Sequence, residues 1–104
     1  MRAQTSGRRN QPSASPVRFR AAPGVGITWC DGQMVLVRHA DHRRYRLNEL
    51  AARIWVLLAN GAPRRIIIAQ LRRQFGAPSD WLEMETARVV ERLLAIGLIE
   101  RRTA

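Results

Sequence analysis

The chain has 104 residues, which suits a single domain with one modest core and leaves little room for a large enclosed active site. Its hydrophobic content of 46% is that of a globular protein, and no apolar run approaches the roughly 20 residues of a membrane span. The N-terminus lacks the apolar stretch of a secretory signal. The only cysteine, Cys30, cannot form an internal disulfide, so we expect a cytoplasmic protein.

The net charge of +10 is unevenly distributed along the chain. All 18 basic residues are arginines, and five of them lie in residues 1–20, which contain no acid; residues 21–104 keep 13 arginines and eight acids, a net charge of +5. The first 16 residues are rich in Ser, Gln, Pro and Arg and cannot bury enough apolar surface to offset their ordering entropy. We therefore predict a disordered tail over 1–20 and one folded domain over 21–104. An organellar transit peptide has a similar composition, but Gly7, Pro12 and Pro16 disfavour the amphipathic helix that it needs.

The first half of the domain has the pattern of short strands. Val25–Cys30 and Gln33–His39 flank Asp31-Gly32, a dipeptide that favours a tight hairpin turn because both residues tolerate positive φ. A second turn at 40–42 leads to a third strand, Arg43–Leu47. The expected structure is a three-stranded antiparallel meander.

After residue 47 the apolar period changes from two to about 3.6, which indicates helices. Asn48 is a suitable N-cap, and Gly61 and Gly97 are suitable stops. The expected helices are Glu49–Asn60, Pro63–Phe75, and a third from Ser79 or Asp80 to about Ile96. In the second helix the buried side is expected to hold Ile67, Ile68, Leu71 and Phe75. The predicted fold class is α+β and winged-helix-like, with the three-stranded sheet followed by three helices, and Leu98-Ile99 packing back on the core.

The third helix has two distinct faces. Its core face is formed by Leu82, Val89, Val90, Leu93 and Leu94. A second side carries Trp81, Met84, Glu85, Arg88, Arg92 and Ile96. A Trp and a Met beside arginines suggest a second contact surface. Alternatively, Trp81 and Met84 cover the sheet edge or the tail.

The sequence offers no anchor for catalysis. His39, His42 and Cys30 match no common zinc spacing, and Cys30 is expected to be a small buried hydrophobe. No nucleophile–base arrangement and no Gly-rich phosphate loop is present. We therefore predict a non-enzymatic protein without a metal or cofactor.

Three segments in this order resemble PqqD-like proteins, the precursor-peptide recognition elements of ribosomally made, modified peptides (RiPPs). They are LNELAARIWVLLANG (47–61), an apolar second helix, and VVERLLAIGLIE (89–100), preceded by a hairpin with VLV (35–37) and the strand RRYRL. The resemblance covers about residues 24–100. Ile54-Trp55 looks most like the stand-alone members from lasso-peptide clusters.

The resemblance implies a domain that binds the leader segment of a precursor peptide and presents it to a separate enzyme. In a lasso cluster this partner is a leader peptidase; in other clusters it is a radical-SAM enzyme, cyclodehydratase or dehydratase. We expect the domain to be a monomer.

The residues themselves allow such binding. The third strand has one unpaired edge, to which an extended peptide can add as a further strand. Alternation places Arg43, Tyr45 and Leu47 on one face and the other two arginines on the opposite face. The predicted peptide-binding residues are Arg43, Arg44, Tyr45, Arg46 and Leu47 of the strand and Trp81, Met84, Glu85, Arg88 and Arg92 of the third helix.

A winged-helix DNA-binding regulator is the alternative. The second and third helices would form a helix-turn-helix, with Arg88 and Arg92 on phosphates. Against this, the strands precede the helices, and no hairpin-length segment follows Gly97 to form the usual wing. We therefore expect a peptide rather than a nucleic acid as the partner.

Overall fold

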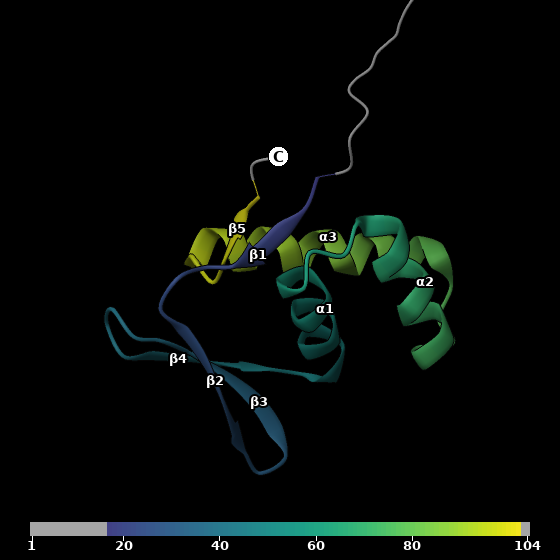
Figure 1. Cartoon of the computed structure of the whole chain (residues 1–104). Coiled ribbons are helices and arrows are strands. Elements are labelled where there is room, and N and C mark those ends of the chain that lie inside the picture. The colour runs from purple at the N-terminus through teal and green to yellow at the C-terminus, as the bar shows by residue number, and fades with distance from the viewer. Residues whose placement is uncertain (1–16, 103–104) are drawn as a thin grey trace, which may run out of the picture.

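Two antiparallel sheets and three helices form the part of the chain that the computed structural model describes, residues 17–102. Figure 1 shows their arrangement. In chain order the elements are β1 (Phe19–Ala21), β2 (Val25–Cys30), β3 (Gln33–Arg38), β4 (Arg43–Leu47), α1 (Glu49–Ala59), α2 (Arg64–Phe75), α3 (Ser79–Ile96) and β5 (Ile99–Arg101). The α+β class is confirmed.

The predicted meander is present as a three-stranded sheet with the order β2-β3-β4. The β2–β3 turn has positive φ at both Asp31 (54°) and Gly32 (77°), as the Asp-Gly pair indicated. In the sheet Met34 stands opposite Trp29 on one side and Leu47 on the other, so these three side chains share one face.

A second, two-stranded sheet corrects the prediction of a single sheet. Strands β1 and β5 pair antiparallel, with Arg20 opposite Glu100, and the Arg20 Nε donates to Glu100 Oε2 over 2.6 Å. The predicted boundary at residue 20 is also wrong, because Phe19 lies in β1 and is only 9% exposed. The first 16 residues of the predicted tail lie outside the described part of the chain. Two three-residue strands 80 positions apart give no local pattern that a sequence reading can detect.

The three helices begin and end close to the expected residues. The Asn48 side chain caps α1 by accepting a hydrogen bond from the Ala51 N–H at 2.8 Å, and Gly97 ends α3 with φ 86°. At the start of α3, however, the N-cap position is Pro78, and no side chain caps the helix. Phe75 is 37% exposed rather than buried, because it is the last residue of α2, where the chain turns away at Gly76.

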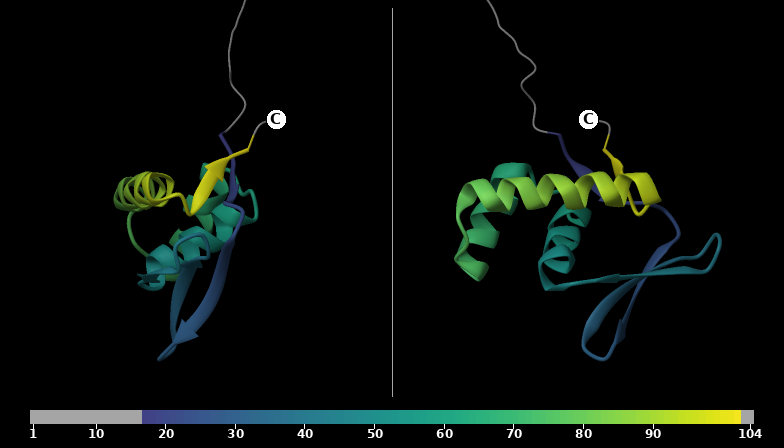
Figure 2. Two further views of the ribbon diagram at one scale, coloured as in Figure 1. Left: turned by 90° about the vertical axis from the view of Figure 1, so that its left-hand side faces the viewer. Right: turned by 180° about the vertical axis from the view of Figure 1, so that it is seen from behind.

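Helix α1 is central to the packing. It contacts β3 and β4 as well as α2 and α3, and Ile54 and Leu58 on it are almost fully buried. Figure 2 shows the long α3 crossing the other two helices, with the three-stranded sheet at one end of the helical layer. Leu98 and Ile99 pack back on the core, as expected, with 0% and 2% exposure. No helix within residues 17–102 has both the length and the apolar character to cross a bilayer.

Candidate functional site

An open groove of about 490 Å³ lies between β4 and α3, with the start of α1 at its base. The strand enters α1 directly through Asn48, and α3 packs against α1, so the two walls of the groove are fixed by one shared helix. The residues that line it are Arg44, Tyr45, Arg46, Leu47, Asn48, Ala51, Glu85, Arg88, Val89, Arg92, Leu93, Ile96 and Leu98.

Strand β4 forms one border of the sheet. It pairs with β3, and no other strand of the described chain pairs with it. In a strand, alternate residues direct their N–H and C=O groups to the same side, so every second residue of β4 presents both groups to the groove. This edge is able to accept a further strand.

The side chains of β4 alternate as predicted. Tyr45 and Leu47 stand opposite Leu36 and Met34 on the helix-facing side, where Leu47 is 8% exposed and belongs to the core. Arg46 faces the other side, where its guanidinium donates to Gln33 Oε1 at 3.1 Å and also approaches the Cys30 sulfur. The helix-facing side of β4 therefore supplies apolar contact area at the base of the groove.

The opposite wall, on α3, is charged at its rim and apolar below. Arg88 Nη1 lies 3.4 Å from Glu85 Oε2, and the Arg88 side chain is 69% exposed. Arg92 forms no ion pair within residues 17–102. Four arginines and one glutamate are among the lining residues, but the Arg46 guanidinium lies on the far side of the sheet. Arg88 and Arg92 give the α3 wall a positive potential suited to an acidic ligand.

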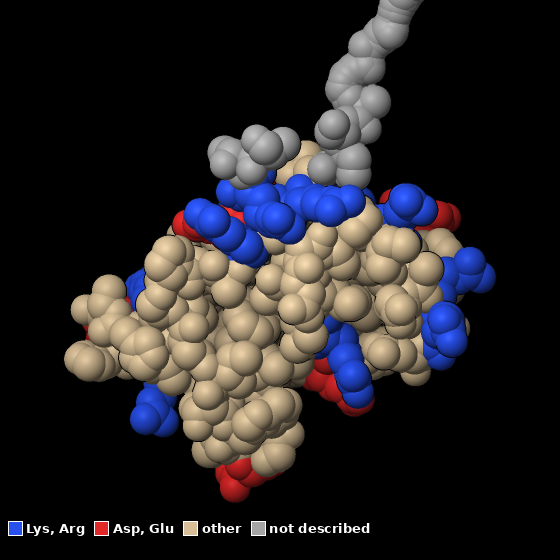
Figure 3. Space-filling view, in the orientation of Figure 1, with Lys and Arg blue, Asp and Glu red and all other residues tan. Residues whose placement is uncertain are grey.

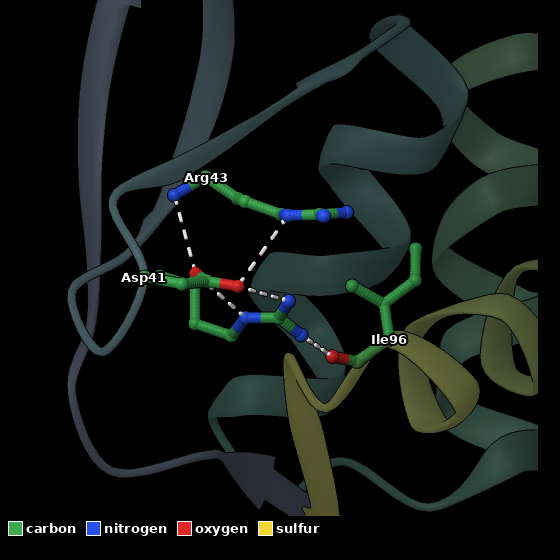
Figure 4. A network of polar contacts seen from close by, with 4 residues as sticks. Asp41, Arg43 and Ile96 are labelled. Carbon is green, nitrogen blue, oxygen red and sulfur yellow. Dashed lines mark hydrogen bonds and ion pairs between the residues drawn. The ribbon is translucent and has the colours of Figure 1, made fainter.

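A polar network fixes the β3–β4 turn against α3 (Figure 4). Arg38 contacts Asp41 with two bonds, Nε to Oδ1 at 3.1 Å and Nη2 to Oδ2 at 2.6 Å, and its Nη1 donates to the Ile96 carbonyl. Asp41 also accepts from the Arg43 backbone N–H at 3.2 Å. Hydrogen bonding from the guanidinium lowers the pKa of the Asp41 carboxyl from 3.8 to about 2, and the same contact raises the pKa of Arg38. The guanidinium lies 5.6 Å from the ring centre of Tyr45.

This network sets the geometry of the groove. Ile96 lines one wall, and the turn held by Asp41 begins the strand that forms the other. Arg38 therefore links the two walls near Ile96 and helps to fix their separation, although it does not line the groove itself.

Seven of the ten predicted site residues are brought together in this groove: Arg44, Tyr45, Arg46, Leu47, Glu85, Arg88 and Arg92. The other three are not among its lining residues. Arg43 is held at the turn by Asp41, with 3.5 Å between Nε and Oδ2. Trp81 and Met84, which are 43% and 53% exposed, lie on the N-terminal half of α3. Only about the last three turns of α3 face β4, so these two positions fall short of the groove.

Six further lining residues were missed: Asn48, Ala51, Val89, Leu93, Ile96 and Leu98. Val89 and Leu93 belong to the predicted core face, which the structure confirms, since Leu93 is 3% exposed and Val89 is half-buried. The base of the groove is therefore part of the core surface. The strand-to-helix junction at Asn48 could have predicted that Asn48 and Ala51 line the groove, because a strand that continues directly into a helix places the start of that helix beside the strand's border.

Comparison with known proteins decides the family. The family model described as "Coenzyme PQQ synthesis protein D (PqqD)" matches residues 33–99, which is more than half of the chain. The chain belongs to the PqqD family. No curated protein matches it.

Two solved structures share the fold of this PqqD-family chain. One is "Lasso peptide synthetase B1 complexed with the leader peptide", with a TM-score of 0.73 and 24% identity over 80% of this chain and 98% of that one. The other is "TbiB1 in Complex with the TbiA(beta) Leader Peptide", with a TM-score of 0.71 and 19% identity over 82% of this chain and 99% of that one.

Cys30 in this PqqD-family chain is half-buried rather than buried, because β2 is at the border of the sheet and the Arg46 guanidinium covers the thiol from one side only. Its sulfur lies 3.6 Å from Arg46 Nη2 and 3.9 Å from Asp31 Oδ2. Among residues 17–102, no three His, Cys, Asp or Glu side chains come together as metal ligands would.

Proposed function

We propose that this PqqD-family chain binds the leader segment of a ribosomally synthesised precursor peptide. The leader adds as a strand to the border of β4 and lies in the groove against α3. The domain performs no chemistry and presents the peptide to a separate enzyme, a lasso-peptide leader peptidase. Binding takes place in the cytoplasm, where precursor peptides are made, and the domain acts as a monomer.

The observation that carries this proposal is the border of β4, with which no second strand of residues 17–102 pairs, beside a groove. Main-chain hydrogen bonds from alternate residues of β4 provide affinity for any extended backbone. The helix-facing side of Tyr45 and Leu47, with Val89 and Leu93 across the groove, offers apolar area for the leader side chains that point inward. Backbone pairing and side-chain contact are thus available to one ligand in one place.

The charge of the groove favours a leader with acidic residues. Arg92 has no acidic partner within the described chain, and Arg88 has only the partly exposed contact with Glu85. An acidic side chain of the leader that reaches either guanidinium gains an ion pair and is attracted over a distance of about 8 Å at physiological salt. Ordering a free peptide costs several kcal/mol, so we expect a dissociation constant between about 10 nM and about 10 µM.

Both structural neighbours were solved with leader peptides, and they support the proposal through their shared fold. The family match supports it further, since it extends over every strand and helix that forms the groove.

The test is a titration of isotope-labelled protein with leader peptides of precursor genes identified in the same organism, followed by amide NMR shifts. Residues 43–47 and 85–96 should shift first. Two leader analogues sharpen the result. N-methylation of the leader residues whose N–H groups face β4 should abolish binding, whereas methylation of the residues between them should leave it nearly unchanged. Equal effects of the two analogues would exclude strand addition.

The DNA-binding alternative is tested with the same protein. A gel shift at physiological salt with duplex DNA should show no complex at concentrations that saturate leader binding. Sequence-specific binding of DNA, combined with no shift on leader addition, would replace the proposed function.

A further inference from the structure

The opposite border of the sheet, strand β2, carries the most exposed aromatic side chain of the described chain. Trp29 is 63% exposed and Ile27 is 49% exposed. Both stand on the helix-facing side, opposite Met34 and Leu36, which are buried in the core. Ile27 and Trp29 therefore lie on the same face of the sheet as the core residues, but on the part of that face that the helices leave uncovered.

A second groove, of about 690 Å³, lies next to Trp29 between the β2–β3 hairpin and α1. Its apolar lining includes Met34, Ala52 and Val56, and Val56 is itself 37% exposed. Glu49 and Arg53 on the α1 side carry one charge of each sign. We call this surface, formed by Ile27, Trp29, Ala52, Arg53 and Val56, the β2–α1 face.

Strand β2 is not protected in the way that β4 is. Border strands of soluble proteins usually carry charged residues that prevent pairing with other chains. Strand β4 has three arginines, whereas β2 (VGITWC) has no charged residue and no proline. Figure 3 shows basic side chains gathered over β1, β5 and α2, whereas the β2–β3 hairpin carries mostly uncharged atoms, with acidic atoms at its tip. A border without charge and with a protruding Trp indicates a partner that covers it.

The β2–α1 face and the groove on β4 have no residue in common, although Leu47 lines both grooves and marks the place where they meet. Helix α1 lies between the two, with Ala51 lining the first groove and its neighbour Ala52 lining the second. The two grooves lie on either side of the same helix and at opposite borders of one sheet. A peptide in the first groove therefore leaves the β2–α1 face open.

Charge distinguishes three kinds of partner for this face. A second copy would bring together two chains of net charge +10, and such self-repulsion favours the monomer. An anionic ligand such as nucleic acid finds no cluster of arginines on this face. The second groove is lined by Asp31, Glu49 and Arg53, so its charges are nearly balanced. The surface fits a different protein that offers an uncharged strand and an apolar recess for the indole.

We propose that the β2–α1 face docks the enzyme that receives the peptide, with Trp29 as its central contact. This inference rests on the proposed function, since it assigns the presenting step to a second surface. The domain then holds its two partners on opposite borders of one sheet, with α1 between them.

The experiment uses the full chain and a purified leader peptidase from the same organism, chosen because it cleaves the precursor whose leader this chain binds, with affinity measured by calorimetry. Trp29→Ser should weaken peptidase binding about tenfold or more, the scale of a central interface Trp, and leave leader affinity and the melting temperature unchanged. Ile27→Lys, which places a charge on the border, should have a similar effect. The matched control Ala51→Leu should weaken leader binding only.

The outcomes separate this inference from the proposed function. Peptidase affinity that is unchanged in both β2 variants, or an absence of binding to the wild-type chain, overturns the docking role. A dimer seen by sedimentation that Trp29→Ser dissociates also overturns it and assigns the face to a second copy. Failure of the wild-type chain to bind the leader, measured without peptidase, contradicts the proposed function instead.

Discussion

The guanidinium of Arg38 donates a hydrogen bond to the backbone carbonyl of Ile96 and so joins the end of β3 to the end of α3. The same guanidinium holds Asp41 in the following turn through two bonds. One side chain thereby connects the strand that precedes β4 to the helix across the groove. The shape of the groove depends on this contact although Arg38 does not line it.

The ion pair with Arg38 makes the stability of the turn depend on acid pH. The folded-state pKa of Asp41 is lowered to about 2 from 3.8, so its contribution is fully present above pH 3.8 and is lost as the pH falls toward 2. The melting temperature of Asp41→Asn should therefore lie below that of the wild type at pH 6, with the difference shrinking between about pH 4 and about pH 2. A control is Asp31→Asn, in the other hairpin turn, where the side chain forms no ion pair within residues 17–102. A gap for Asp41→Asn that stays constant with pH would contradict the assignment.

Charge reversal on α3 should weaken leader binding without unfolding the protein. Arg88→Glu and Arg92→Glu each should lower the affinity by about three- to tenfold, mainly through slower association, with an effect that diminishes at high salt. Both side chains are exposed, so the melting temperature should change little. Arg65→Glu, an exposed position on α2 away from the groove, is the matched control. A large loss of stability would show that Arg88 or Arg92 is structural.

Filling the groove should block the leader selectively. Ala51→Leu adds three carbon atoms at the base of the groove and should reduce leader affinity about tenfold or more, the scale on which a pocket rejects added bulk. Ala52→Leu adds the same atoms one residue further along, in the second groove, and should leave leader affinity unchanged. Fluorescence anisotropy with a labelled leader measures both. Equal losses in the two variants would mean that leader binding is not confined to the β4 groove.

Thr86 should be replaceable by valine with a gain in stability. Its side chain is 2% exposed, and its hydroxyl has no hydrogen-bond partner within the described residues. A buried polar group without a partner costs about 1–3 kcal/mol, and valine has nearly the same shape. Urea unfolding of Thr86→Val should show a higher free energy of unfolding, whereas the exposed Thr28→Val should show little change. A lower free energy for Thr86→Val would mean that the hydroxyl does form a hydrogen bond.

Local signals predicted most of the fold. The Asp31-Gly32 turn, the Asn48 cap and the Gly97 stop each depend on residues close in sequence, and each is present in the structure. The β1–β5 sheet was missed because its pairing joins residues 80 positions apart, and three residues carry no periodicity. The sequence pattern of a segment predicts its secondary structure, but it does not predict which distant segment pairs with it.

The lining of the β4 groove was predicted only in part for a related reason. Helical periodicity identifies a side of α3 but not how much of its length faces β4, so the predicted set includes Trp81 and Met84, which do not line the groove. The sequence also did not predict that Trp29 is exposed. Alternation in β2 places Trp29 on the helix-facing side of the sheet, but it does not show how far the helices cover that side. How much of a strand or helix is covered by its neighbours depends on tertiary packing, which the sequence pattern of one segment does not contain.

Because the two ends of the described chain are in contact, the domain is suited to insertion into another protein. The Arg102 N–H donates to the Arg18 carbonyl over 2.9 Å, so the entry and exit points are neighbours. A host protein can therefore accept residues 17–102 within a surface loop without having to stretch across the inserted domain. By the same reasoning, a short linker between the two ends would close the chain into a ring, which could be reopened at the Asp31-Gly32 turn as a circular permutant.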